Sequence, residues 1–245
     1  MARVPLVDFD GNPTGELIER SRIHKRGKDL EATLSELHGQ GHVIIFDRRG
    51  RVLTAKRDRK KMFLPGVWLP LHGGHIDEKD LRDSKALRRE GYDQREFLYL
   101  LGAAREASEE TGLEINPYNL TEIDRRKLDL TGISGFTNYL HIRTYAMTYD
   151  RKKHGKLRPN KREVEEAKWR KPIHIVEDRM LVSLGSDNKG SYGRAVQDAI
   201  ERISKEIRMA NWYLNTKDRV YETIGRIANA DLFKLLKTTL KRGLF

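Results

Sequence analysis

The sequence predicts an α/β fold, because short β-branched runs alternate with segments of helical periodicity. Residues 42–46 (HVIIF) and 52–55 (VLTA) flank a turn at residues 47–50, which is typical of a β-hairpin. Residues 96–111 carry apolar side chains three and four positions apart, and Gly112 follows where such a helix would end. Residues 138–149 are rich in aromatic and β-branched side chains and favour a strand.

Two regions follow from these patterns. Residues 1–182 are expected to form the mixed α/β domain, with a short strand within residues 164–176. Residues 77–95 are highly charged and interrupt this domain, with a short helix expected around residues 81–89. Residues 190–245 are expected to form a C-terminal helical extension, with helices over residues 195–213 and 221–240.

Composition restricts the class of protein. The 245 residues include 34% charged side chains and give a formal charge of +12, which favours a phosphate-bearing partner. Cysteine is absent from the sequence, which excludes disulfides, thiolate metal sites and cysteine nucleophiles. No run approaches the roughly 18–20 apolar residues of a membrane helix. We therefore expect a cytoplasmic protein without a membrane partner.

Three glutamates carry the strongest chemical signal. Glu106, Glu109 and Glu110 are spaced i, i+3 and i+4, so a helix places them on one face. Like charges so close together repel, and Mg²⁺ would offset that repulsion because it prefers oxygen ligands and bridges carboxylates to phosphates. Arg105, the residue before them, is expected to orient one of the carboxylates.

The segment containing these glutamates, REASEETGL, fits the second half of the signature G-x5-E-x7-R-E-U-x-E-E-x-G-U, where U is apolar. The chain therefore resembles the Nudix hydrolases. The resemblance implies an α/β/α sandwich with a mixed sheet and a Mg²⁺ cofactor, with Mn²⁺ as an alternative. It also implies metal ligands at Glu106, Glu109, Glu110 and Gly74, and catalytic roles for Arg105, Glu109 and Glu110.

The chain departs from this signature in one place. Gly74 and Arg105 are 31 positions apart where the signature has 14, so about 17 residues are inserted. Spacing therefore does not assign the signature's first glutamate. Glu96, nine positions before Arg105, is the first choice, and Asp80, at the signature's distance from Gly74, is the second.

Residues 5–75 resemble the branch of the family that contains isopentenyl-diphosphate isomerase and its hydrolase-like relatives. In those isomerases, histidines matching His38 and His75 belong to a metal site, so both are candidate binding residues here. The isomerase's catalytic cysteine would fall at Gly73, which argues against isomerase chemistry. The resemblance also makes Glu163 a candidate additional acid, with Glu165 and Glu166 as alternatives.

The expected reaction is Mg²⁺-dependent hydrolysis of a nucleoside diphosphate linked to another group. Glu109, Glu110 or a distant glutamate would act as general base, and Arg57 and Arg59 would clamp phosphate oxygens. Two alternatives remain. One is a binding module for RNA or a nucleotide, favoured by the positive charge. The other assigns the C-terminal helices to a homodimer or partner contact.

Overall fold

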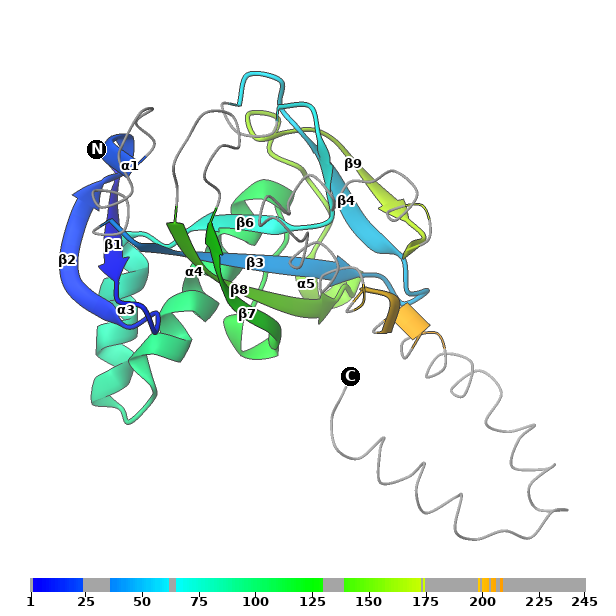
Figure 1. Cartoon of the computed structure of the whole chain (residues 1–245). Coiled ribbons are helices and arrows are strands. Elements are labelled where there is room, and N and C mark those ends of the chain that lie inside the picture. The colour runs from blue at the N-terminus through cyan, green and yellow to red at the C-terminus, as the bar shows by residue number, and fades with distance from the viewer. Residues whose placement is uncertain are drawn as a thin grey trace, which may run out of the picture.

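A mixed β-sheet forms the centre of the molecule (Figure 1). The computed structural model describes residues 2–23, 36–61, 65–129, 139–172 and 174, and single positions between 198 and 208. Strand β3 (His38–Phe46) pairs in parallel with β8 (Tyr139–Thr148) and antiparallel with β6 (His72–His75). Strand β7 (Thr121–Asp129) extends the sheet beyond β8. The mixed sheet and the α/β class are confirmed.

The predicted hairpin is also present. Strand β4 (Val52–Arg57) turns back antiparallel to β3, and the Asp47 carboxylate accepts the backbone N–H groups of Arg49 and Arg51 within the turn. Strand β4 then pairs with β5 (Trp68–Leu69) and β9 (Val164–Arg170). These three strands form an antiparallel branch of the sheet.

The beginning of the chain folds more regularly than its interrupted apolar pattern indicates. Strands β1 (Arg3–Val7) and β2 (Pro13–Glu19) form a hairpin, followed by α1 (Arg20–Ile23). The Leu6–His38 pairing joins this hairpin to β3. Strand β7 was not predicted either, because its sequence, TEIDRRKLD, is mostly charged. A charged strand is stable here because, among the described strands, β7 pairs with β8 alone and lies at an edge.

Two helices cover one face of the sheet. Helix α3 (Glu78–Arg89) occupies the charged insertion and starts at a capping box formed by Asp77 and Asp80. Helix α4 (Gln94–Thr111) begins at Asp93 and ends at Gly112, which adopts the left-handed conformation at φ 69°. The two helices lie side by side near β1 (Figure 1). The predicted helix and its glycine stop are thus present.

Helix α4 approaches the sheet closely because β3 carries glycine beneath it. A Cβ atom on Gly41 would lie 2.8 Å from the Cβ of Ala103. The main hydrophobic core fills the remaining space between the helix and the strands. Its fully buried members include Val43, Ile45, Leu53, Ile76, Leu98 and Tyr99. This packing fixes α4 over the sheet and so determines where its polar face points.

Short elements complete the described chain. The 3-10 turn η1 (Pro117–Asn119) follows α4, and α5 (Arg151–His154) follows β8. Most of the expected C-terminal helices lie outside the described residues, but the described positions between 198 and 208 are helical. Among them, the buried Ser204 hydroxyl donates to the Gly50 carbonyl oxygen at 2.5 Å. In the described part of the chain, no helix has both the length and the hydropathy needed to span a bilayer.

Candidate functional site

The last two turns of α4 carry the three glutamates identified in the sequence. The side chains of Glu106 and Glu110 are 16% and 11% exposed, whereas that of Glu109 is 58% exposed. Helical spacing explains this, because Glu106 and Glu110 are one turn apart and point toward neighbouring strands. Two of the carboxylates are therefore held within the protein, and the third faces solvent.

Arg105 connects several of these groups. Its Nη1 donates to Oε1 of Glu106 at 2.8 Å and to Oε1 of Glu109 at 3.3 Å. Its Nη2 donates to the His75 carbonyl oxygen at 2.9 Å, at the end of β6. Because five N–H donors leave the guanidinium in fixed directions, these bonds set the orientation of both carboxylates.

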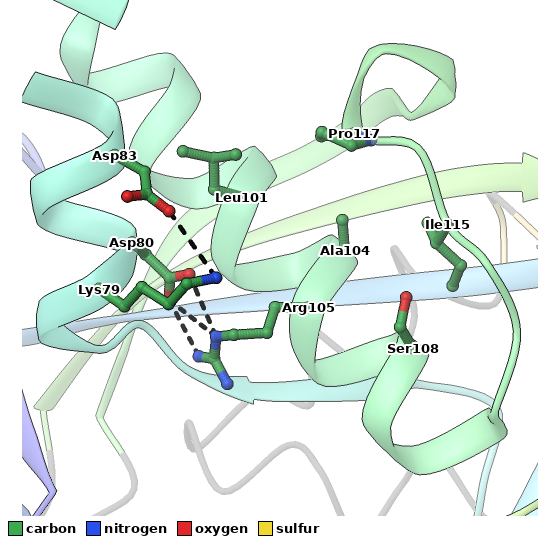
Figure 2. Close-up of a pocket in the computed structure, with 9 residues that line it drawn as sticks. All are labelled: Lys79, Asp80, Asp83, Leu101, Ala104, Arg105, Ser108, Ile115 and Pro117. Carbon is green, nitrogen blue, oxygen red and sulfur yellow. Dashed lines mark hydrogen bonds and ion pairs between the residues drawn. The ribbon is translucent and has the colours of Figure 1, made fainter. Parts of the chain in front are cut away.

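The acidic partner of Arg105 on α3 is Asp80. Nη2 of Arg105 lies 2.9 Å from Oδ2 of Asp80, and Nε lies 3.1 Å from Oδ1 (Figure 2). Glu96, the first choice from the sequence, is exposed in the first turn of α4. Glu96 lies nine positions before Arg105 along the helix, a rise of about 13.5 Å. The structure therefore favours Asp80 as the first acid of the signature.

Burial and charge act in opposite directions in this cluster. Burial raises the pKa of Asp80 and the pKa of Glu106, and Arg105 opposes the rise in both cases through hydrogen bonds and charge. Burial alone would lower the pKa of Arg105, but Asp80 and Glu106 outweigh it and raise that pKa. The guanidinium thus stays charged and supports two buried carboxylates.

Gly74 lies directly against one of the glutamates. A Cβ atom at position 74 would be 2.5 Å from Oε2 of Glu106, so only glycine fits without moving that carboxylate. Residue 74 pairs with Gly41 in the β3–β6 ladder, which fixes its backbone. The structure therefore places Gly74 directly against Glu106.

Glu110 lies beside a residue that the sequence analysis did not identify. Its Oε2 lies 3.5 Å from Nδ1 of His72, a buried residue of β6. His72 lies two positions before Gly74, and this proximity to the signature glycine was the only sequence signal for it. The three carboxylates consequently have different neighbours: Glu106 and Glu109 accept hydrogen bonds from Arg105, and Glu110 lies beside His72.

The donor set suits a hard divalent cation. Glu106, Glu109, Glu110 and the Gly74 carbonyl supply only oxygen ligands, which Mg²⁺ and Mn²⁺ accept. Within the described ranges, no group of three acidic or histidine side chains is arranged so that it could hold a metal ion by itself. Mg²⁺ does not need one, because it keeps several waters and takes further ligands from substrate phosphates. The residues therefore fit an open site that is completed by substrate.

The histidines at the start of β3 and the end of β6 form a pair. The rings of His38 and His75 stack with centroids 5.0 Å apart. Nδ1 of His38 lies 3.0 Å from the Glu36 carbonyl oxygen, and Nε2 of His75 lies 3.2 Å from the Gln40 side-chain nitrogen. The pair is linked to the glutamate cluster through the His75 carbonyl, which accepts from Arg105.

The remaining predicted residues lie where β4 meets β9. Arg59 is exposed and pairs with Glu165 at 3.2 Å, and Glu165 also accepts an ion pair from Lys56 at 2.8 Å. Glu163 pairs with Lys61, and Glu166 pairs with Lys168 at 2.6 Å. Arg57 ends β4, and its charge contributes, after burial, to lowering the pKa of His42 to about 4. The ion pair of Lys56 with Glu165 joins the two strands, and the other pairs lie within β9 or beside the strand ends.

A small hollow of about 170 Å³ lies between α3, α4 and the segment that leads to η1 (Figure 2). Asp80 and Arg105 point toward each other at its edge, and Ile115 and Pro117 close the far side. None of the three glutamates lines it. This hollow therefore borders the Asp80–Arg105 ion pair and not the three glutamates.

Comparison with known proteins finds similar solved structures and a matching family. A MutT protein from Methanosarcina mazei Go1 is similar at 17% identity and TM-score 0.43, covering 69% of this chain and 94% of its own. A NUDIX hydrolase from Alicyclobacillus acidocaldarius is similar at 16% identity and TM-score 0.47, covering 58% and 82%. No curated protein sequence matches the chain. The NUDIX domain model matches residues 38–183, more than half of the chain. The protein therefore belongs to the Nudix family, whose hydrolases cleave pyrophosphate bonds.

Proposed function

We propose that this protein is a Mg²⁺-dependent pyrophosphohydrolase whose substrate is a nucleoside diphosphate linked to another group. One observation carries the proposal. The Glu106 carboxylate lies against Gly74 and accepts a hydrogen bond from Nη1 of Arg105. The Glu109 carboxylate accepts from the same nitrogen. Two acids about one turn apart that accept from a single guanidinium nitrogen could supply oxygen ligands to one cation.

Each residue of the site has a separate role in the proposed reaction. Arg105 fixes the direction of Glu106 and Glu109, and Asp80 fixes Arg105. A divalent cation, when bound, supplies charge neutralisation on the diphosphate and lowers the pKa of water at the site. Glu109 is the most exposed of the three glutamates and is therefore the most open to an incoming water, from which it would take up a proton. Glu109 is thus the preferred general base, with Glu110 as the alternative.

Hydrolysis is favoured over isomerisation by the backbone at position 73. The resemblance to isopentenyl-diphosphate isomerase would place a cysteine there, but Gly73 adopts φ 154°. A Cβ atom at this position would collide with the Gly41 carbonyl oxygen. The strand pairing therefore leaves no room for a side chain, and the acids of α4 remain the reactive groups.

A binding module for RNA or nucleotides is the second candidate function. The net charge of +12 favours it, because Lys and Arg side chains attract phosphate backbones. The basic side chains around β4 and β9 are, however, largely paired with Glu163, Glu165 and Glu166. Neutralised in this way, they offer a weaker polyanion surface than the net charge alone indicates.

The test compares two glutamates that differ in position but not in chemistry. Glu109→Gln removes the carboxylate charge at the proposed site, and Glu114→Gln does the same at an exposed position beyond the helix. We expect Glu109→Gln to lower turnover by about 10²–10⁴-fold, the usual contribution of a general base, with unchanged thermal unfolding. Glu114→Gln should retain wild-type activity.

The assay is phosphate release, after coupled phosphatase treatment, from a panel of nucleoside diphosphate derivatives, dinucleoside polyphosphates and capped RNA with Mg²⁺ or Mn²⁺. Salt-dependent RNA binding is measured on the same preparations. Near-normal metal-dependent hydrolysis by Glu109→Gln would refute its role. RNA binding without hydrolysis of any substrate would favour the binding module.

A further inference from the structure

The outward face of helix α3 carries a row of positive charge. Spacings of three and four positions place four cations on one side of this helix. They are Lys79, Arg82, Lys85 and Arg89, and all four are exposed. The opposite side, which includes Asp80 and Leu81, is buried against the fold. The insertion that interrupts the signature thus turns lysine and arginine side chains toward solvent.

Nearby acids neutralise only part of this row. The Asp83 carboxylate lies 3.8 Å from Lys79 and 3.8 Å from Arg82, so one acid is shared by two cations. Among the described residues, three exposed cations of the helix have no carboxylate within ion-pair distance: Lys85, Arg88 and Arg89. Even with the exposed Glu90 at its end, the helix presents more positive than negative charge to solvent.

Two exposed tyrosines lie beyond the last turn of α3, where α3 and α4 meet at an outer corner of the fold (Figure 1). Tyr92 is 45% exposed, and Tyr118 of η1 is 60% exposed. Both rings pack on the mostly buried Phe97, with ring centroids 5.0 Å away for Tyr92 and 5.5 Å away for Tyr118. Tyr92 follows Arg89 by three positions, so the aromatic pair continues the basic face.

We propose that the basic face of α3, together with Tyr92 and Tyr118, docks a single-stranded nucleic acid. Lysine and arginine attract the phosphates of such a strand, and exposed aromatic rings stack on its bases. In a duplex the bases are already stacked on one another, so the tyrosines would meet no free base. An anionic membrane would need apolar side chains beside the charges, but the exposed apolar residue of α3 is Ala86 alone.

The readout is the fluorescence anisotropy of a labelled RNA strand of about 20 nucleotides, titrated with the full chain at several salt concentrations. The same sequence as single-stranded DNA and as an RNA duplex, and vesicles that contain phosphatidylserine, are titrated in parallel. We expect the single strands to bind more tightly than the duplex and the vesicles. The test concerns binding only, so it does not depend on hydrolysis.

Two triple variants separate the surface from the net charge. The α3 variant combines Lys85→Gln, Arg88→Gln and Arg89→Gln. The α5 variant combines Arg151→Gln, Lys152→Gln and Lys153→Gln, also at exposed positions, so both variants lose the same charge. We expect the α3 variant to lower the slope of log affinity against log salt by about 2, since each phosphate contact on a single strand contributes about 0.7. The α5 variant should bind as wild type does.

Substitutions of the tyrosines test stacking. Tyr92→Leu and Tyr118→Leu should each weaken strand binding about 5- to 150-fold, the usual effect of losing one stacked base. Tyr92→Phe and Tyr118→Phe keep the ring and should retain the affinity. Phe9→Leu is the control, because it removes an exposed aromatic ring from the turn between β1 and β2. Thermal unfolding of each variant shows whether it is folded.

Several results would overturn the inference. Equal weakening in the α3 and α5 variants would show that net charge alone attracts the strand. Unchanged affinity in both leucine variants, or equal affinity for duplex and single strand, would exclude stacking. Vesicle binding that needs the α3 cations, without strand binding, would assign the surface to a membrane. Strand binding without hydrolysis of any substrate would support the inference and count against the proposed function.

Discussion

Replacement of Asp80 by Asn tests the support beneath the active helix. The substitution keeps the shape of the side chain and removes its charge. Asp80 is 3% exposed and holds Arg105 through Nη2 at 2.9 Å and Nε at 3.1 Å. It also accepts the backbone N–H of Asp77 at 2.9 Å, which closes the capping box of α3. The change therefore weakens both the ion pair and the start of the insertion helix.

The expected loss of unfolding free energy depends on the partners that Arg105 retains. Breaking a buried ion pair costs about 3–5 kcal/mol when the remaining charge has no other partner. Arg105 retains ion pairs with Glu106 at 2.8 Å and with Asp77 at 3.5 Å, so its charge stays paired in the variant. We therefore expect a loss of about 2–3 kcal/mol, the range of hydrogen bonds to charged groups. Turnover should also fall by about 10–100-fold, because Arg105 orients the metal-binding acids.

Urea unfolding followed by circular dichroism measures the stability, and metal-dependent hydrolysis measures the activity. Glu96→Gln is the matched control, because it removes a carboxylate from an exposed position of α4. Its unfolding free energy should stay within about 0.5 kcal/mol of wild type. If Glu96→Gln lowered stability or activity as much as Asp80→Asn, the assignment of Asp80 as the partner of Arg105 would be refuted.

Two further predictions concern glycine and histidine positions. Gly74→Ala should reduce metal-dependent activity at least tenfold, because the added methyl group displaces the Glu106 carboxylate. Gly91→Ala is the control: position 91 has φ 94° and open space around it, so the change should cost about 1 kcal/mol of stability and no activity. Loss of activity in Gly91→Ala but not in Gly74→Ala would contradict the site geometry. Burial and neighbouring cations lower the pKa of His141 to about 4. The unfolded chain therefore gains a proton below about pH 6.5 that the folded chain does not. The contribution of His141 to the unfolding free energy is therefore fully present above pH 6.5 and is lost as the pH falls toward 4. His141→Gln should reduce this loss of unfolding free energy by up to about 3 kcal/mol. If urea unfolding showed the same dependence on pH in the variant and in wild type, the prediction would be refuted.

The parts of the fold that the sequence predicted are those with local, repeated signals. Helix α4 has apolar residues at helical spacing and a glycine stop, and both hold in the structure because Gly112 takes the left-handed conformation. The β3–β4 hairpin has β-branched runs on both sides of an Asp-containing turn. In each case the local preference and the tertiary packing agree, so the pattern is sufficient.

Elements whose stability comes from their neighbours were not predicted. Strand β7 consists largely of charged residues and exists because β8 supplies its hydrogen-bond partners. Strands β1 and β2 likewise depend on pairing with each other and on the Leu6–His38 contact. No periodicity within such a segment shows that a partner strand will lie beside it.

The site shows the same division between local and distant contacts. The spacing of Glu106, Glu109 and Glu110 is local to one helix, so the sequence identified them. Asp80 lies 25 positions before Arg105, and the insertion between them means that the spacing of the signature does not relate the two. His72 reaches Glu110 across the space between a strand and a helix. Only the folded structure brings such pairs together.

The most direct test of the account is the position of a divalent ion in crystals grown with Mn²⁺, located by its anomalous scattering. We predict one peak in contact with carboxylate oxygens of Glu106, Glu109 and Glu110 and with the Gly74 carbonyl. The same peak should be lost or weakened in crystals of Glu109→Gln. A peak at the His38–His75 pair alone, or none beside α4 at saturating Mn²⁺, would contradict the account.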